Sequence, residues 1–214
     1  MKFNIDPKVK NVLEWIYCFV IAIVIALLIK YFIGTPTVVK QVSMNDTLKE
    51  GQRLWLNRWV KTVNGKYERG DIITFEAPSE SILSLDSLDY SNLVAIYNNE
   101  PKGLWKKFTY YVLEQGKLSY IKRIIGVAGD TIKIEDGKVF LNGELLDEPY
   151  LNEGTLTEPV IFSEVTVPEG YVFVMGDNRA HSTDSRSFGC IPVDKIESRV
   201  AFRFWPLNKF GGVD

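Results

Sequence analysis

The sequence predicts a mainly β protein, built from antiparallel strands, that follows one N-terminal transmembrane helix. An uninterrupted apolar stretch of membrane length lies near the N-terminus. The rest of the chain contains short runs of β-branched and aromatic residues, separated by Gly, Asp, Asn and Pro. A length of 214 residues, 46% of them apolar and 24% charged, suffices for one globular domain with its own core beside the anchor.

The first element is the apolar stretch at residues 12–33, which we interpret as a membrane anchor after a short tail, residues 1–11. At about 1.5 Å per residue it reaches roughly 30 Å, enough to cross a hydrocarbon core. Its charges, Glu14 and Lys30, lie near the ends, where long side chains reach the headgroups. Aromatic residues occupy the positions of interfacial belts: Trp15, Tyr17, Tyr31 and Phe32. A cleaved signal peptide and a buried core helix are the alternatives, but no Ala-x-Ala-like cleavage triplet follows.

The lysines around the anchor indicate its orientation. Three precede it and two lie at or beyond its far end: Lys2, Lys8, Lys10, Lys30 and Lys40. This slight bias favours a cytoplasmic N-terminus, and thus a cell-membrane protein whose domain at residues 34–214 is extracytoplasmic. Membrane lipid is then one expected partner. A net charge of -2 gives no electrostatic reason to expect nucleic acid as another.

Five segments beyond the anchor have the composition of strands. They are residues 69–78, 120–130, 131–146, 170–178 and 198–206. Asp136-Gly137 and Asn142-Gly143 are hairpin dipeptides, because both favour positive φ in tight turns. We therefore predict a mainly antiparallel domain in which residues from about 131 to 170 form a cap-like hairpin region.

Residues 79–118 interrupt the strand pattern and are predicted to be a partly helical insert. Apolar residues recur there at helical spacing: Leu104, Phe108, Tyr111 and Val112. Asn98 or Asn99 is available as the cap and Gly116 as the stop. Either the helix packs on the sheet as an ordinary amphipathic helix, or it lies on the membrane surface. The second hypothesis rests on its basic and aromatic residues: Lys102, Trp105, Lys106, Lys107 and Phe108.

Cysteine and histidine content excludes several kinds of site. Cys18 lies within the apolar stretch, so a disulfide to Cys190 is not expected, and neither cysteine belongs to a metal-binding pair. His181 is the single histidine, which excludes a multi-histidine site. We expect neither a metal nor a cofactor.

Ser43 lies in the turn-rich segment KQVSMNDTLKEG, ten residues beyond the apolar stretch, and is either a plain turn residue or a nucleophile. A serine hydroxyl needs a base to take its proton. Lys122, in YIKRII, shares a strand face with Tyr120 and Ile124. Burial there would lower its pKa towards about 7–8, whereas the adjacent Arg123 stays charged. A lone lysine in a strand is more often a snorkelling surface residue.

A third segment, GDNRAHSTDSRSFG at residues 176–189, is dense in hydroxyls, carboxylates and arginines. It is either a polar turn or a loop that holds a lysine in place. In the second case Ser182 would bond the amine, and Asp184 with Arg186 would brace the loop as an ion pair.

Taken in order, S-M-x-x-T-L after an anchor, K-R-I-I-G-x-x-G-D, and G-D-N-R-x-x-S-x-D-S-R-x-x-G resemble the bacterial type I signal peptidases, in their Gram-positive-like, single-anchor form. The ordered set covers essentially the whole chain. The resemblance implies antiparallel β-sheets around a site that removes signal peptides from secreted preproteins, with small residues before the cut and substrate bound as an added strand.

The resemblance also implies roles for individual residues. Ser43 matches the nucleophile and Lys122 the general base of a Ser–Lys dyad. Four residues match positions that support the lysine and its loop: Ser182, Asp177, Asp184 and Arg186. The backbone N–H of Ser43 would serve the oxyanion hole, with Gln41 as a further amide donor. Met44 matches a position that shapes the pocket for the small residue before the cut.

Some positions depart from the family pattern. Asp46 and Ala128 stand where prolines are usual, and Gln41 and Val42 stand where glycine is common. A carboxylate near the site would raise the pKa of Lys122. The long insert is atypical of compact Gram-positive members. Two alternatives follow: a tethered binding or assembly protein that lost turnover, or a self-cleaving repressor, which should carry a DNA-binding segment instead of an anchor.

Overall fold

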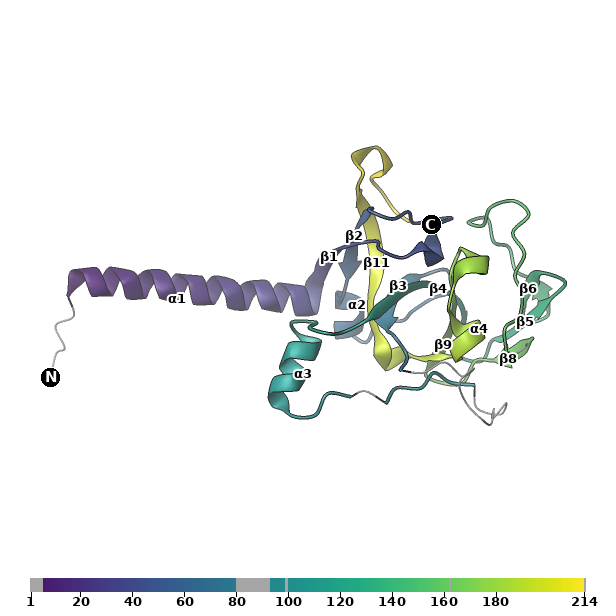
Figure 1. Ribbon diagram of the computed structural model, residues 1–214, viewed down its shortest axis with the longest axis horizontal. Helices are drawn as coiled ribbons and strands as arrows, with labels where there is room; N and C mark the ends of the chain where they lie inside the picture. The colour runs from purple at the N-terminus through teal and green to yellow at the C-terminus, as the bar shows by residue number, and fades with distance from the viewer. Residues whose placement is uncertain (1–5, 80–92, 99, 162, 214) are drawn as a thin grey trace.

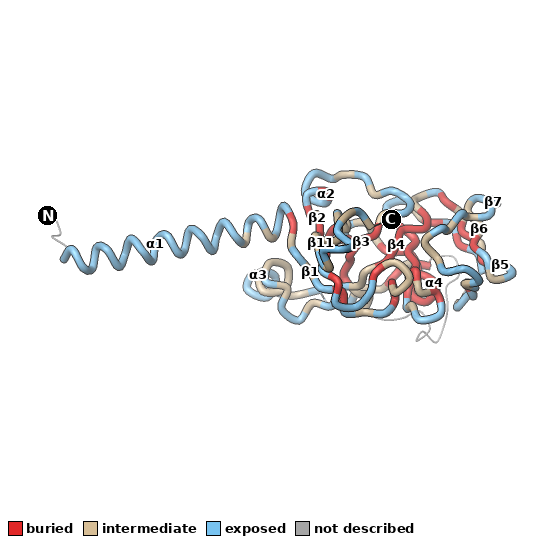
Figure 2. The backbone as a smooth tube through the Cα atoms, turned by 90° about the horizontal axis from the view of Figure 1, so that it is seen from above, coloured by how far each residue is buried: buried red, intermediate tan, exposed pale blue. Residues whose placement is uncertain are grey.

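The computed structural model describes residues 6–79, 93–98, 100–161 and 163–213. The apolar stretch forms a long helix, α1 (Pro7–Leu28), which continues as a π-helical turn, η1 (Ile29–Ile33). The helix begins earlier than predicted, because Asp6 caps it by accepting a hydrogen bond from the Lys8 N–H and Pro7 suits the first turn. It projects from the β domain and is exposed along its length (Figures 1 and 2).

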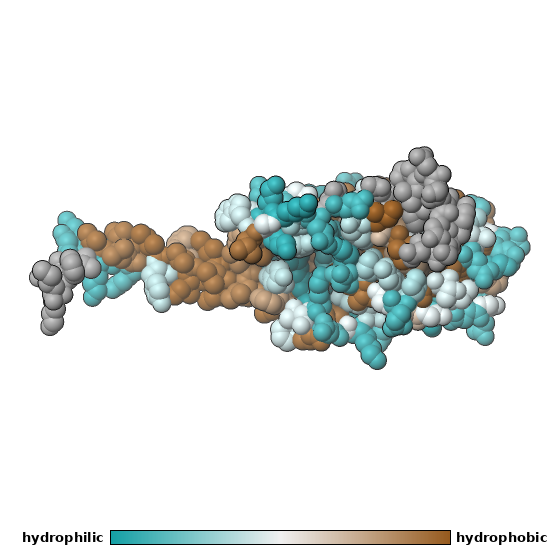
Figure 3. Space-filling view, turned by 90° about the horizontal axis from the view of Figure 1, so that it is seen from below, coloured by the Kyte–Doolittle hydropathy of each residue, from teal (hydrophilic) through white to brown (hydrophobic). Residues whose placement is uncertain are grey.

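Within the described residues, this is the one helix long and apolar enough to cross a membrane. Its surface is hydrophobic between a more hydrophilic N-terminal end and the mixed surface of the domain (Figure 3). None of the apolar window is buried against the protein, so it is not a core helix of this chain. Both cysteines are free, Cys18 on this helix and Cys190 in the domain core.

Within the described residues, the larger sheet has seven strands in the order β1-β2-β11-β3-β4-β9-β10, all antiparallel to their neighbours. Their bounds are β1 (Gly34–Val38), β2 (Arg53–Asn57), β3 (Ile72–Glu76), β4 (Ser119–Val127), β9 (Tyr171–Met175), β10 (Ile191–Pro192) and β11 (Ile196–Trp205). The predicted segments at 69–78, 120–130, 170–178 and 198–206 thus contain strands, as expected. β1 is an edge strand and leads directly from the anchor into the sheet.

The smaller sheet has four strands in the order β7-β6-β5-β8. Its strands are β5 (Thr131–Glu135), β6 (Lys138–Leu141), β7 (Glu144–Leu145) and β8 (Glu164–Thr166). Both predicted turns are present, with Asp136 and Asn142 at φ values of 51° and 54°. This sheet falls within residues 131–170 and lies on the side of the domain away from the anchor (Figure 1).

Short helices complete the domain. They are η2 (Val42–Met44), α2 (Trp59–Thr62), α3 (Leu104–Tyr111), η4 (Arg179–His181), α4 (Ser185–Phe188), η5 (Val193–Lys195) and η6 (Leu207–Lys209). The insert is therefore helical in part, but its cap was predicted wrongly. The helix starts after Gly103 (φ 90°) and has no side-chain cap. Pro101 separates the predicted asparagines from the helix, and Asn99 lies outside the described residues.

Three apolar clusters form the core among the described residues. One packs Phe173 and Met175 of β9 against Ile132 and Val139 of the smaller sheet, so the two sheets share a core. A second lies on the larger sheet around Phe75, Ile124 and Phe188. The third supports the segment after β1 and is described with the site, because it holds Ser43 in place.

Candidate active site

Ser43 lies in η2, a 3₁₀ turn that follows β1. The next residue, Met44, is fully buried with Leu48 and Leu54, which anchors the turn in the core. Asn178 holds the turn from the other side: its backbone N–H donates to the Ser43 carbonyl at 3.0 Å, and its side-chain amide donates to the Val42 carbonyl at 3.0 Å. The turn is therefore fixed between the core and a distant loop.

Lys122 reaches this turn from β4. Its Nζ donates to Ser43 Oγ at 2.7 Å and to the Ile121 carbonyl at 3.1 Å. It also lies 5.2 Å from the ring centre of Tyr120, on the same face of the strand. The side chain is only 2% exposed, so it is no snorkelling surface lysine. Burial lowers its pKa to about 8, against the opposing charges of Asp184 and Asp177.

The next residue in β4, Arg123, points to the opposite face. Its Nε and Nη2 donate to the two carboxylate oxygens of Asp177 at 3.0 and 2.9 Å, and its Nη1 donates to the Gly70 carbonyl. The Tyr150 ring lies 3.9 Å from the guanidinium carbon. Asp177 also accepts from Thr47 Oγ1. This buried pair connects β4 to the loop that carries Asn178, and so to Ser43.

Asp184 and Arg186 form the ion pair expected within the loop at residues 176–189. Arg186 Nε and Nη2 donate to the two oxygens of Asp184, each at 2.9 Å. Asp184 also accepts from the Gly176 N–H at 3.0 Å and caps α4. Both residues are almost fully buried. The loop is therefore braced by charge-assisted hydrogen bonds on the side away from solvent.

Ser182 lies beside the dyad without a direct bond to it. Its Oγ is buried and has no hydrogen-bond partner among the described residues, and Lys122 donates to other acceptors. Gly176 accounts for the close packing here, because a Cβ on it would collide with Ser182 Oγ and lie 2.5 Å from the Ser43 carbonyl oxygen. The role of Ser182 as an orienting group stays a prediction.

A cavity of about 340 Å³ opens in front of Ser43 and Lys122. Its remaining lining residues are Lys40, Gln41, Val42, Tyr120, His181 and Thr183. Gln41, a predicted amide donor, thus lies on the cavity, whereas Met44 is buried behind the turn and is not among the lining residues. The Ser43 backbone N–H donates to no acceptor among the described residues, so it can donate a hydrogen bond to a ligand. His181 bonds Asn178, at 3.2 Å, rather than Ser43.

The carboxylate of Asp46 is separate from this site. It lines another cavity, with Tyr150 and Arg203. The carboxylates that raise the pKa of Lys122 are Asp184 and Asp177. The expectation that Asp46 would raise the pKa of Lys122 is therefore wrong.

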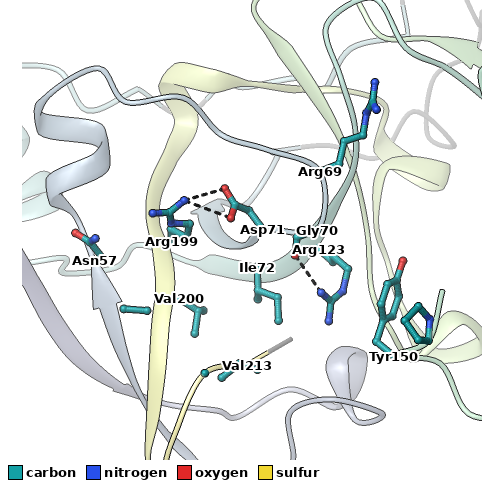
Figure 4. Close-up of a pocket in the computed structure, with 13 residues that line it drawn as sticks. Asn57, Arg69, Gly70, Asp71, Ile72, Arg123, Tyr150, Arg199, Val200 and Val213 are labelled. Carbon is teal, nitrogen blue, oxygen red and sulfur yellow. Dashed lines mark hydrogen bonds and ion pairs between the residues drawn. The ribbon is translucent and has the colours of Figure 1, made fainter. Parts of the chain in front are cut away.

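A larger cavity, of about 870 Å³, lies on the Arg123 face of β4 (Figure 4). Its three arginines already have acidic partners: Arg69 with Asp130, Arg123 with Asp177 and Arg199 with Asp71. Size alone would favour this cavity as a ligand site. The smaller one instead combines a hydroxyl, a buried amine and an unused backbone N–H, which is the set that acyl transfer needs.

Several residues of the site framework were missed from the sequence. From the sequence, Arg123 is only a group that cannot act as a base. The buried ion pair between Arg179 and Glu148, with Thr157 beside it, was not foreseen either. Arg179, in the GDNR segment, is the sequence feature that points to a buried ion pair. Its partner Glu148 is 31 residues away, so sequence spacing does not identify it.

Comparison with known proteins agrees with the geometry. The family model described as signal peptidase, peptidase S26, matches residues 12–205. The signal peptidase I of Bacillus licheniformis is 31% identical, over 97% of this chain and 96% of its own length. Signal peptidase I S of Bacillus subtilis (strain 168) is 34% identical, over 98% and 97%. A solved signal peptidase I from Enterococcus faecalis V583 is 25% identical, covers 64% of this chain and 97% of that one, and has a TM-score of 0.39.

The family model and the two Bacillus relatives match nearly the whole chain, and the family model extends from the apolar helix to β11. The family is one of membrane-anchored peptidases, and one N-terminal apolar helix fits such an anchor. The chain belongs to the signal peptidase family, peptidase S26.

Proposed function

We propose that this protein is a serine endopeptidase that removes N-terminal signal peptides from secreted preproteins, with Ser43 as nucleophile and Lys122 as general base. The observation that carries the proposal is the 2.7 Å distance between Lys122 Nζ and Ser43 Oγ. A buried amine with a pKa of about 8 is partly uncharged at neutral pH and can accept a proton. Curated relatives named signal peptidase I support the substrate class.

In the proposed reaction, uncharged Lys122 takes the proton of the Ser43 hydroxyl as Oγ attacks the carbonyl carbon of the scissile bond. Negative charge then develops on the carbonyl oxygen, where the Ser43 backbone N–H donates, and the Gln41 amide is a second donor. The lysine ammonium returns the proton to the leaving amine. Water, deprotonated by the same amine, then attacks the acyl carbon. The bond from that carbon to Ser43 Oγ breaks, and Oγ takes the proton back from the lysine ammonium.

The remaining roles are those of positioning residues. Asp177 and Asp184 hold the loop at residues 176–189 through their arginine partners, and this loop carries Asn178, which bonds the turn of Ser43. Ser182 would bond the amine once a substrate or water rearranges the hydrogen bonds around it. Met44 would act from behind the turn, by supporting Ser43 rather than by touching the substrate.

The substrate would bind in an extended conformation along β1. A groove of about 540 Å³ is lined by residues 35–41 on one side and 117–121 on the other, and it shares Lys40, Gln41 and Tyr120 with the cavity of Ser43. Because β1 is an edge strand, it has unpaired backbone groups that an added strand can use. With the N-terminus cytoplasmic, this groove would open at the outer face of the membrane.

The test is cleavage of a preprotein by the full-length chain in proteoliposomes, with the cut site mapped by mass spectrometry. We expect cleavage after a small residue in the wild type and none by the Ser43→Ala variant. Binding of the preprotein without product, by a folded wild type, would instead support the tethered binding protein. Equal cleavage by wild type and Ser43→Ala would exclude Ser43 as the nucleophile.

A further inference from the structure

Helix α3 leaves its apolar side uncovered. Leu104, Trp105 and Phe108 are 90%, 74% and 38% exposed, and no residue of the helix is buried. At 100° per residue the three side chains fall within one arc of the helix. The rings of Trp105 and Phe108 lie 5.8 Å apart, so the exposed residues form one patch. An amphipathic helix that packed this face on the sheet would bury the patch, so the exposure favours the alternative, a helix on the membrane surface.

The opposite side of α3 is held by the domain. The Tyr110 hydroxyl donates to Glu76 at 2.9 Å. Lys117, just beyond the helix, lies 2.6 Å from Glu197 and within 5.5 Å of the Tyr110 and Tyr111 ring centres. These contacts fix the rotation of the helix about its axis. The apolar patch is therefore presented outward by the fold.

Contacts after α3 place the helix at the outer end of the anchor. Glu114 forms ion pairs with Lys30, at 2.9 Å, and with Arg58. A cavity of about 280 Å³ is lined by Tyr31 and Phe32 of the anchor together with Tyr111 of α3. In two perpendicular views α3 lies beside the last turns of the anchor (Figures 1 and 2). Once the anchor spans a bilayer, α3 lies at the depth of the headgroups.

The charged side chains of α3, together with Lys102 just before it, are all basic. Lys102, Lys106 and Lys107 are exposed and have no acidic partner among the described residues. Trp59 and Val63, in and just after α2, are also more than half exposed. They lie near the same end of the anchor, because Thr62 of α2 donates a hydrogen bond to the Phe32 carbonyl. Basic and aromatic residues beside an apolar helix face are the composition of helices that lie in an anionic membrane surface.

We propose that α3 is an interfacial helix that docks on anionic lipid headgroups, with Leu104, Trp105 and Phe108 inserted and Lys102, Lys106 and Lys107 paired with lipid phosphates. The anchor alone fixes the distance of the domain from the membrane, whereas a second attachment also fixes its rotation about the anchor. The mouth of the substrate groove would then keep one orientation to the bilayer. This proposal does not depend on the peptidase chemistry.

The test uses the full-length chain, with Cys18→Ser, in protein-free vesicles of phosphatidylcholine and phosphatidylglycerol. A spin label is attached at Trp105→Cys or, as a control, at Leu145→Cys, an exposed apolar residue of β7 at the far end of the domain. Cys190 is fully buried and does not compete for the label. We expect the label at 105 to collide several-fold less with a water-soluble nickel chelate, and more with oxygen, than the label at 145.

Charge reversal tests the lipid preference. Lys106→Glu/Lys107→Glu should raise the accessibility of the label at 105 to the nickel chelate in anionic vesicles, up to the value at position 145, because losing the two lysines costs roughly 25-fold in preference for such surfaces. The matched control is Lys133→Glu/Lys138→Glu, the same charge change in the distant sheet, which should leave accessibility unchanged. In vesicles of pure phosphatidylcholine, which carry no net charge, the two double variants should differ less in the nickel accessibility of the label at 105.

Two results would overturn the proposal. Equal water accessibility at positions 105 and 145 in anionic vesicles would mean that α3 does not touch lipid, and would leave its apolar patch to a protein partner. The label at position 105 could also be shielded from the nickel chelate to the same extent in the Lys106→Glu/Lys107→Glu variant and in pure phosphatidylcholine. That result would show that neither the lysines nor anionic headgroups hold α3 at the membrane. Neither readout involves cleavage, so failure here says nothing against the Ser43–Lys122 dyad.

Discussion

Lys122 and Arg123 are neighbours in β4, yet only Arg123 bonds a carboxylate directly. Arg123 donates to both oxygens of Asp177, while Lys122 donates to Ser43 Oγ and to a backbone carbonyl. The pair with Asp177 keeps a cation on one face of the strand. On the other face burial dominates, and the pKa of Lys122 falls to about 8. Opposite faces of one strand thus hold a permanent charge and an amine that titrates near neutral pH.

The first prediction concerns the dependence of cleavage on pH. If uncharged Lys122 is the base, kcat/KM should rise about tenfold per pH unit below its pKa and level off above about pH 8. Initial rates on a preprotein, from pH 6 to pH 9.5, would measure this. A flat profile would contradict a lysine base.

The second prediction separates the charge of Lys122 from its proton-accepting ability. Lys122→Arg should lose at least about a thousandfold in kcat, because a guanidinium accepts no proton at accessible pH. Lys122→Met, which fills similar space without charge, should be equally inactive. Single-turnover cleavage of a preprotein measures both. Substantial activity of the arginine variant would mean that the base is another group.

The third prediction is that Lys122→Met stabilises the fold at neutral pH. Burial lowers the pKa of Lys122 in the folded state from its ordinary 10.5 to about 8, so at pH 7 the wild type carries a charge that folding desolvates. Removing it should increase the free energy of unfolding by on the order of 2 kcal/mol at pH 7. Between about pH 8 and 10.5 the unfolded chain binds more protons than the folded one, so wild-type stability rises and the difference shrinks. Thermal unfolding in micelles at pH 7 and pH 10 checks the sign.

The fourth prediction concerns Asp177, whose charge raises the pKa of Lys122. In Asp177→Asn that contribution is lost, so the rising limb of the pH profile should move to lower pH. The same change leaves Arg123 buried without its counter-charge, and it should destabilise the protein by about 3 kcal/mol. Asp130→Asn is the matched control, because Asp130 is buried and paired with Arg69 but is not among the charges acting on Lys122. If the pH at which activity rises is the same in Asp177→Asn as in the wild type, the charge of Asp177 does not act on Lys122.

The fifth prediction concerns Asp46, which stands where related sequences commonly have proline. Its backbone N–H has no acceptor among the described residues, whereas the N–H of Thr47 donates to the Met44 carbonyl at 2.9 Å. Asp46→Pro should keep activity within about threefold and change stability by less than about 1 kcal/mol, since the helical conformation of Asn45 offsets the entropic gain. Thr47→Pro, which removes that hydrogen bond, should be clearly worse in both cleavage rate and melting temperature. Equal damage in the two variants would show that Asp46 has a role of its own.

The sequence predicted the strands that have regular β-branched patterns and missed those that do not. β1 contains Pro36, which removes a backbone donor and suggests a turn, but an edge strand tolerates it. β2 is a five-residue strand whose alternating Leu54 and Leu56 are too short a pattern to stand out, although Gly51 turns the chain just before it. The two Asp-Gly and Asn-Gly hairpins were predictable because their positive φ values are a property of those residue types.

In the site, the sequence predicted which residues lie together, through a resemblance, but not how each is bonded. Ser43 and Lys122 are 79 residues apart, and no local pattern joins them. The role of Arg123 as the partner of Asp177 could not be predicted, because it depends on which strand face meets the loop at residues 176–189. Ser182 is a second example. The sequence predicts that it lies near Lys122, but not that its buried Oγ has no hydrogen-bond partner among the described residues.

The hydrogen bonds from Asn178 to the turn of Ser43 have a consequence for biosynthesis. They join segments about 136 residues apart, so the turn gains its support only when nearly the entire domain is present. A chain still being synthesised, in which residues 43 and 122 are present and residue 178 is not, would lack the hydrogen bonds that support the turn of Ser43. On this basis, nascent and truncated copies should be inert, and proteolytic capacity should arise only as the last strands join the sheet.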